Sequence, residues 1–306
     1  MNHHHHDRSH DHAAHTTHAS HFAFATAIIL NLGYTVAQAT YALMANSMGL
    51  LADAGHNLGD VLALILAWGA NWLLTLPARK RYSYGFKRTT ILAALSNSLI
   101  LVAAAALIAY ETIYKLFHLS PINTHIVIIV ALVGIIINGG TALLFLKGAR
   151  EDLNIKSALY HLLSDALISF GVVVAAMLVM WTGKLWIDPL IGLVIVVTIL
   201  QGTRGLLRDS VSLLLDAVPH HINHVEVKHY LENLPGITAV HDLHIWGLST
   251  REIALTAHLV MPQGMLSDAD YQKINTLLRE KFKIQHATIQ VESGSIEHPC
   301  EQSERC

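Results

Sequence analysis

The sequence predicts an α-helical membrane protein with six transmembrane helices, followed by a small α+β domain in the cytoplasm. Of the 306 residues, 53% are hydrophobic and only 14% are charged, whereas about a quarter of the residues in a soluble domain are charged. The apolar residues also gather into runs of about 20, the length needed to cross a bilayer. After residue 208 the pattern becomes polar and alternating, which predicts the second domain.

The six predicted spans form one domain over residues 22–208. Each is a run of roughly 20 or more mostly apolar residues, and several are long enough to tilt or to emerge from the bilayer. Turn-forming residues such as Pro77, Pro121 and Pro189 separate the runs. The spans are residues 22–44, 48–75, 89–117, 122–147, 157–181 and 186–206.

Cationic residues in the loops predict the orientation of the spans. The loop after the second span, PARKRYSYGFKR, is rich in Lys and Arg, and further cations follow the fourth and sixth spans. The loops on the opposite side contain few cations. Because Lys and Arg accumulate on the cytoplasmic side of a membrane, we expect both termini in the cytoplasm.

Residues 209–295 have the pattern of a small folded domain. A helix-like stretch around Leu231 is followed by two strand-like runs, TAVHDLHIW and EIALTAHLVM, by the helical run SDADYQKINTLLREKF, and by the strand-like ATIQVE. This αββαβ order predicts an α+β domain with an antiparallel sheet, too polar to enter the bilayer. Residues 296–306 form a tail that holds both cysteines, Cys300 and Cys306.

Histidine is unusually frequent at the amino terminus. The chain has 22 histidines, and many of them lie in residues 1–21, MNHHHHDRSHDHAAHTTHASH. The four consecutive histidines could belong to an expression tag, but the spread of the others favours a native, disordered, weakly metal-binding arm in the cytoplasm.

Two of the predicted spans carry the same pair of titratable residues. His56 and Asp60 lie four residues apart in the second span, and His161 and Asp165 repeat this spacing in the fifth. Residues four apart share one face of a helix. An ionised Asp at the centre of a bilayer costs about 2.5–3.5 kcal/mol, so a repeated pair requires a function. The alternative is a polar helix seam in which these groups bond to one another or to water.

The residue types of this set suit a divalent metal. Two imidazole nitrogens and two carboxylate oxygens form the tetrahedral shell that Zn²⁺ prefers, and the two negative charges balance the ion. Metal binding needs ionised Asp and neutral His, so binding displaces protons and release allows their return. This chemistry predicts zinc export driven by protons through alternating access, with all four ligands taking part in proton coupling. Cadmium, cobalt and nickel accept the same ligands, so the sequence leaves them open as further substrates. Asp53 is expected to be an accessory group near this site.

At these residues the sequence resembles the cation diffusion facilitator family, and within it the bacterial zinc–proton antiporters. The resemblance covers roughly residues 20–295. It depends on S-x-x-L-L-A-D-A-x-H-x-x-x-D from Ser47 to Asp60, H-x-x-x-D in the fifth span, YGFKR before the third, and HDLHIW in the tail domain. It implies a homodimer in the bacterial inner membrane, a tail domain related in fold to copper chaperones, and a transport site made of His56, Asp60, His161 and Asp165.

The resemblance also implies that zinc binds in the tail domain as a regulatory ligand, besides being the transported substrate. The implied ligands are His241, His258, Asp268 and Glu292, with His286 less strongly indicated, and the tail cysteines Cys300 and Cys306 could contribute. The alternative is a set of solvated surface histidines. His241 and His244 are three apart in one predicted strand, so they are expected on opposite faces.

A charge pair between Arg88 and Asp216 is a further implication of the resemblance. It would link the start of the third span to the start of the tail domain and stabilise the dimer. The alternative is an ordinary interfacial cation and an acid at a helix end. The loop between the second and third spans has no His, Asp or Glu, so no metal is expected there.

Two other classes of protein compete with a transporter. An intramembrane metal-dependent hydrolase is disfavoured, because four protein ligands leave no position for a water nucleophile and no His-Glu-x-x-His motif occurs. A membrane-anchored metal sensor would not need six spans.

The expected partners are divalent metal ions, protons, lipid and a second copy of the chain. The net charge of -2 excludes a basic surface for nucleic acid, and neither an enzyme activity nor an organic cofactor is expected.

Overall fold

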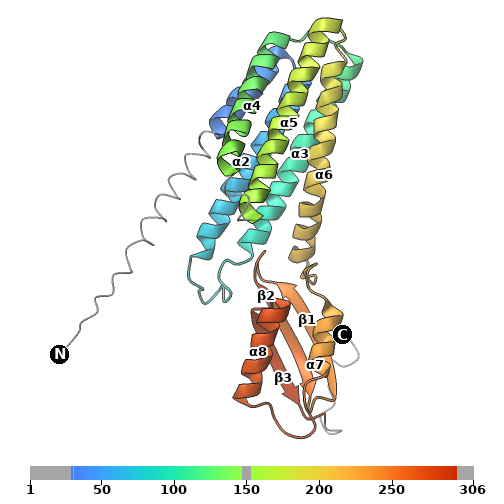
Figure 1. The fold of residues 1–306 in the computed structure, drawn as a ribbon. Coiled ribbons are helices and arrows are strands. Elements are labelled where there is room, and N and C mark those ends of the chain that lie inside the picture. Colours follow the sequence, from blue (N-terminus) through green and yellow to red (C-terminus); the bar gives the residue numbers. More distant parts are fainter. Residues whose placement is uncertain (1–28, 30, 147–152, 295–306) are drawn as a thin grey trace, which may run out of the picture. The chain divides into compact units, whose positions relative to one another are not determined.

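The structure is a computed structural model that describes residues 29, 31–146 and 153–294 of the chain (Figure 1). Five of its helices are long and apolar enough to cross a membrane, and they confirm five of the six predicted spans. Of the first predicted span, residues 31–45 are helical, and its beginning lies outside the described residues. The five helices are α2 (Met48–Leu74), α3 (Thr89–Phe117), α4 (Thr124–Phe145), α5 (Leu153–Thr182) and α6 (Ile187–Leu214).

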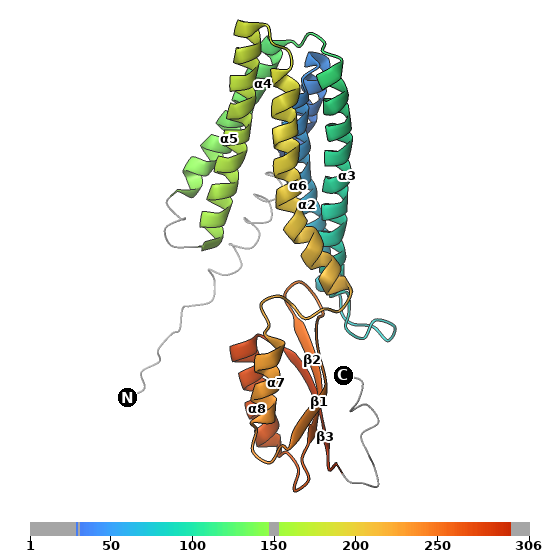
Figure 2. The same ribbon diagram turned by 90° about the vertical axis from the view of Figure 1, so that its right-hand side faces the viewer.

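The chain divides into two compact units. The first comprises Met1–Ile65 and Ile100–Gly202, and the second comprises Leu66–Leu99 and Thr203–Cys306. Within the first unit, α4 and α5 lie side by side in both views (Figures 1 and 2). The second unit contains the tail domain, the ends of α2 and α6, and the loop between α2 and α3 together with the beginning of α3.

The start of α2 is fixed by side chains rather than by helix propensity. Asn46 takes a positive φ of 57°, which ends the preceding helix, and Ser47 then caps α2 by accepting a hydrogen bond from the Leu50 amide at 3.2 Å. Asp188 of α6 accepts hydrogen bonds from the Ser47 hydroxyl at 2.5 Å and from the Met48 amide at 2.6 Å. These bonds satisfy amide groups that a helix start leaves free, and they fix α2 against α6.

Glycine allows α2 to approach its neighbours closely. A Cβ atom at Gly192 of α6 would lie 3.0 Å from the backbone oxygen of Met48. At Gly59, a Cβ atom would lie 2.1 Å from the Leu101 side chain of α3. Gly59 directly precedes Asp60, so α3 packs against the helix segment that carries His56 and Asp60.

The tail domain has the predicted αββαβ order. Helices α7 (His224–Glu232) and α8 (Asp268–Phe282) cover one face of a sheet of three strands, as Figure 2 shows. Val227, Leu231 and Leu278 from the helices pack with Leu255 and Leu259 of the sheet in a buried apolar core. The strands are β1 (Ala239–Gly247), β2 (Ile253–Val260) and β3 (His286–Glu292), in the spatial order β1-β2-β3.

The sheet is mixed, so the prediction of an antiparallel sheet is wrong for one strand. β1 and β2 are antiparallel, but β3 runs parallel to β2. The helix α8 lies between β2 and β3 in the chain, and a helical crossover returns the chain to the same end of the sheet. Adjacent strands joined in this way are therefore parallel.

A β-bulge in β1 corrects the expected positions of two histidines. His241 pairs with His258, and His244 pairs with Thr256, which lies only two residues away on β2. The register therefore shifts by one residue between them, at a point where Asp242 takes a positive φ of 50°. Because of this extra residue, His241 and His244 lie on the same face of the sheet, not on opposite faces.

Candidate functional site

The two His-Asp pairs of α2 and α5 meet in the first unit. The Nε2 atom of His56 lies 3.1 Å from Oδ1 of Asp165 on the other helix. In the same way, Nε2 of His161 lies 3.5 Å from Oδ2 of Asp60. Each histidine is also close to the acid of its own helix, at 3.8 Å for His56 and 3.7 Å for His161. The four residues predicted as the transport site are therefore brought together.

These distances fit a tetrahedral zinc shell. Zinc binds imidazole nitrogen and carboxylate oxygen at about 2.0–2.1 Å, so two ligand atoms of such a shell are separated by about 3.3 Å. The four His–Asp distances lie between 3.1 and 3.8 Å. One ligand atom each from His56, Asp60 and Asp165 lie within 4.8 Å of one another, which leaves His161 to approach from the edge.

The four side chains of the site differ in how far they are exposed. The side chain of Asp165 is 6% exposed, whereas that of His161, one turn earlier on α5, is 51% exposed. His56 and Asp60 have intermediate values. His161 is therefore the most exposed of the four residues, and Asp165 is the innermost.

Asp53 is buried more deeply than Asp165, and it does not join the four-residue set. It is completely buried, and its Oδ2 atom accepts hydrogen bonds from Gln38 at 2.7 Å and from Ser169 at 2.9 Å. Ser169 was not predicted, although its position four residues after Asp165 places it on the same face of α5. Asp53 thus belongs to a separate hydrogen-bonded network, and its accessory role stays a prediction.

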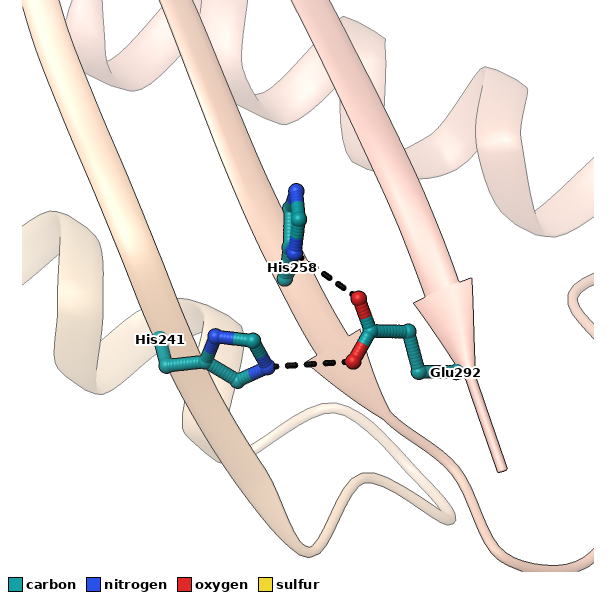
Figure 3. Close-up of side chains that lie close together, drawn as sticks. All are labelled: His241, His258 and Glu292. Atoms are coloured by element: carbon teal, nitrogen blue, oxygen red, sulfur yellow. Dashed lines mark hydrogen bonds and ion pairs between the residues drawn. The ribbon is translucent and has the colours of Figure 1, made fainter. Parts of the chain in front are cut away.

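A second group of metal-type ligands lies on the exposed face of the tail-domain sheet, opposite the helices. Glu292 at the end of β3 points toward both His241 and His258, as Figure 3 shows. Its Oε1 atom is 2.8 Å from Nδ1 of His258, and its Oε2 atom is 3.3 Å from Nε2 of His241. Ligand atoms of these three residues lie within 4.8 Å of one another.

Asp242 adds a carboxylate that the sequence did not reveal. Its Oδ2 atom lies 3.5 Å from Nε2 of His258, and its Oδ1 atom lies 2.9 Å from Nε2 of His244. The bulge at Asp242 turns this side chain toward the histidine face, whereas simple alternation along the strand would place it on the core face. Two imidazoles and two carboxylates fit Zn²⁺ in this group as well.

Two predicted tail-domain ligands do not join this group. Asp268 is the first residue of α8, which covers the other face of the sheet. His286 pairs with Ala254 near the start of β2, whereas Glu292 pairs with Val260 at its end. The remaining predicted ligands, Cys300 and Cys306, lie outside the described residues, as does the histidine-rich segment 1–21.

Two ion pairs connect the loop between α2 and α3 with the rest of the second unit. Arg88 contacts Asp216 at 2.5 Å, the pair that the resemblance implies. The neighbouring Lys87 contacts Glu252 at 2.5 Å, and His286 lies 3.1 Å from the same carboxylate. The hydrogen bond from Lys87 holds the pKa of Glu252 below its ordinary value, His286 adds to this effect, and partial burial opposes it.

A bundle of long apolar helices with buried metal-type ligands and an αββαβ tail defines a membrane transport protein for cations. A family model described as the cation efflux transmembrane domain matches residues 25–215, and one described as the cation efflux protein cytoplasmic domain matches residues 219–294. The chain belongs to the cation efflux family, the cation diffusion facilitators, which confirms the resemblance seen in the sequence.

Several relatives match nearly the whole chain. The metal cation efflux system protein CzcD of Cupriavidus metallidurans is 34% identical over 91% of this chain and 87% of its own length. The cadmium, cobalt and zinc/H(+)-K(+) antiporter of Bacillus velezensis is 32% identical over 88% of each chain. The zinc transporter ZitB of Escherichia coli is 31% identical over 85% of this chain and 83% of its own length.

A solved structure described as the metal-bound C-terminal domain of the CzcD transporter also matches. It is 33% identical, and the match covers 23% of this chain and 99% of that chain with a TM-score of 0.22. The names of the relatives, all efflux systems, antiporters or transporters, agree with the prediction that this chain is not an enzyme.

The Lys87–Glu252 pair predicts a pH-dependent contribution to stability. Because the pKa of folded Glu252 is lowered, the pair stabilises the protein at neutral pH, and this stabilisation is lost as the pH falls through that lowered pKa. We expect Glu252→Gln to reduce stability by about 0.2–1 kcal/mol at pH 7, since the pair is partly exposed. The difference in melting temperature from the wild type should shrink at acidic pH.

The control for this measurement is Glu280→Gln, which removes an exposed acid from α8. Melting temperatures of the full-length protein, followed by fluorescence-detected size exclusion, should separate the two variants at pH 7. Equal melting temperatures for Glu252→Gln and Glu280→Gln at every pH would show that the Lys87 contact adds no stability.

Proposed function

We propose that the chain exports Zn²⁺ from the cytoplasm in exchange for protons, and that His56, Asp60, His161 and Asp165 form the transport site. The observation that carries this proposal is the set of four His–Asp distances of 3.1 to 3.8 Å, two within the apolar helices α2 and α5 and two between them. Two carboxylates balance the charge of one divalent ion, which lowers the cost of holding it away from water.

The ligand types also supply the coupling to protons. Zinc binds neutral imidazole and ionised carboxylate, so zinc and protons compete for the same atoms. When the site opens to the other side of the membrane and zinc leaves, His56 and His161 take up protons. Alternating access then returns protons to the cytoplasm through the residues that carried the metal outward.

The names of the relatives support this direction and chemistry. The relative from Bacillus velezensis is named as an antiporter of cadmium, cobalt and zinc against H⁺ and K⁺, and ZitB is named as a zinc transporter. Cadmium and cobalt accept the same nitrogen and oxygen donors, so they are secondary substrates in this proposal. The proposed setting is the bacterial inner membrane, with six spans and both termini in the cytoplasm.

Transport by purified protein in proteoliposomes tests the site. Zinc added on one side should drive a proton flux in the opposite direction, and Asp165→Ala should abolish both fluxes because it removes the inner ligand. The matched control is Glu111→Gln, which neutralises an exposed acid on α3. Wild-type zinc transport by Asp165→Ala would contradict the assignment of the site.

The choice of metal is set in part by the imidazoles. Replacing His56 with Asp gives the site three carboxylates and one histidine, which weakens its match to the tetrahedral preference of zinc. We expect His56→Asp to raise the rate of cadmium transport relative to that of zinc by several-fold. Competition between the two metals in proteoliposomes measures this ratio, and an unchanged ratio would count against a role of His56 in discrimination.

The tail domain takes part in this proposal as a regulatory zinc site. His241, His258 and Glu292 would hold the ion, and Asp242 is close enough to supply a fourth ligand. We also propose that the chain works as a homodimer, and that the Arg88–Asp216 pair supports the dimer by fixing the start of α3 to the segment that precedes the tail domain.

Counting bound zinc tests the tail-domain site. His258→Ala removes the histidine that contacts both Glu292 and Asp242. We expect this variant of the full-length protein to bind one zinc ion fewer per chain in calorimetry, while Asp165→Ala loses a different ion. The exposed His229 of α7 offers the matched control, His229→Ala. Equal stoichiometry in wild type and His258→Ala would exclude the site.

A further inference from the structure

Asp53 is a buried acid that the metal site does not use. Its fractional exposure is zero, and both of its hydrogen bonds, from Gln38 and Ser169, end on the single oxygen Oδ2. Within the described part of the chain, Oδ1 has no hydrogen-bond partner, and no Lys or Arg forms an ion pair with this carboxylate. A buried carboxylate in this state carries a large desolvation cost, which a proton on Oδ1 removes.

The surrounding network keeps Asp53 in place and leaves Oδ1 free. The Gln38 amide donates to Asp53 through its nitrogen, while its oxygen accepts a hydrogen bond from Asn57 at 2.8 Å. The orientation of Gln38 is therefore fixed from both ends. Ser169 donates from α5 and Gln38 from the helix over residues 31–45, so two neighbouring helices hold the Oδ2 side of the carboxylate, and no described side chain satisfies Oδ1.

Asp53 is close enough to the metal site to respond to its charge. It lies three residues before His56 on α2, a spacing that separates Cβ atoms by about 5–6 Å. Its contact Ser169 lies four residues after Asp165 on α5. The titratable groups that act on Asp53 electrostatically are His56 of its own helix, Asp165 of α5 and Tyr34 of the helix over residues 31–45.

We propose that Asp53 is a proton-binding residue of the antiport cycle, which releases a proton when zinc enters the neighbouring site and takes one up when zinc leaves. This inference extends the proposed function. The bond that breaks is O–H at Oδ1; the electron pair stays on the carboxylate, and the proton passes to water on the side to which the site is open. The positive charge of zinc favours this step through a medium of low dielectric constant, without any contact between Asp53 and the metal.

Such a residue changes the stoichiometry of exchange. The four ligands lose their protons because zinc takes their lone pairs, whereas Asp53 loses its proton only because the nearby charge changes. Replacing Asp53 should therefore leave zinc bound but lower the number of protons that accompany it. A residue with only a structural role would alter folding or affinity and leave this number unchanged.

The experiment measures protons released per zinc bound to the full-length protein in detergent. Calorimetric titrations with ZnCl₂ in two buffers of different ionisation enthalpy give this number, and the His258→Ala background removes the tail-domain site. Asp53→Asn, which is nearly isosteric, should release up to about one proton fewer per zinc. Glu111→Gln is the control and should release as many protons as the background protein.

Ser169→Ala is a milder second variant in case Asp53→Asn does not fold. It removes one donor that stabilises the ionised carboxylate, so zinc-linked proton release should extend to higher pH. Zinc binding with unchanged proton release in Asp53→Asn, or an unchanged pH profile in Ser169→Ala, overturns the proposal. Failure of the proposed transport site gives a different result from failure of the Asp53 proposal, because Asp165→Ala would then bind and transport zinc like the wild type.

Discussion

The buried negative charge between α2 and α5 is the constraint on which the membrane domain depends. Asp165 is almost fully buried and Asp53 is completely buried, in helices whose other residues are mainly apolar. Carboxylates in such a setting need a cation or a proton, since the Coulomb and desolvation terms are large where water is excluded. The adjacent histidines, a divalent metal and protons are alternative ways to meet the same electrostatic need, and exchange among them is the basis of the proposed antiport.

The packing of α2 controls where this charge is held. Asp188 and Ser47 fix the start of the helix, and Gly59 lets α3 pack closely beside Asp60. Neither feature contacts a ligand. Both nevertheless determine the height and rotation of α2 relative to its neighbours, and ligand atoms of a zinc site tolerate displacements of only a fraction of an ångström.

The features that the sequence predicted well are those encoded locally. The long apolar runs predicted α3 with the bounds Thr89–Phe117, and the repeated four-residue spacing predicted which residues of α2 and α5 come together. The misses concern positions that depend on distant parts of the chain. The crossover through α8 makes β3 parallel to β2. The positive φ of Asp242 brings a second carboxylate to the tail-domain group of His241, His258 and Glu292. The register between β2 and β3 separates His286 from His258. The order of apolar and polar residues within one strand does not determine the direction, the bulge or the register of its pairing with other strands.

The two groups of ligands contain the same chemical types but differ in how the backbone holds them. The membrane group takes one histidine and one acid from each of two helices, so a small movement of α2 against α5 changes both inter-helix distances, His56–Asp165 and His161–Asp60, at once. The tail-domain group takes its residues from three hydrogen-bonded strands. Breaking that group requires breaking the sheet, because its strands cannot slide without losing register. The helix-borne group therefore suits binding and release in every cycle, whereas the strand-borne group suits an ion that stays bound while the transport cycle turns over.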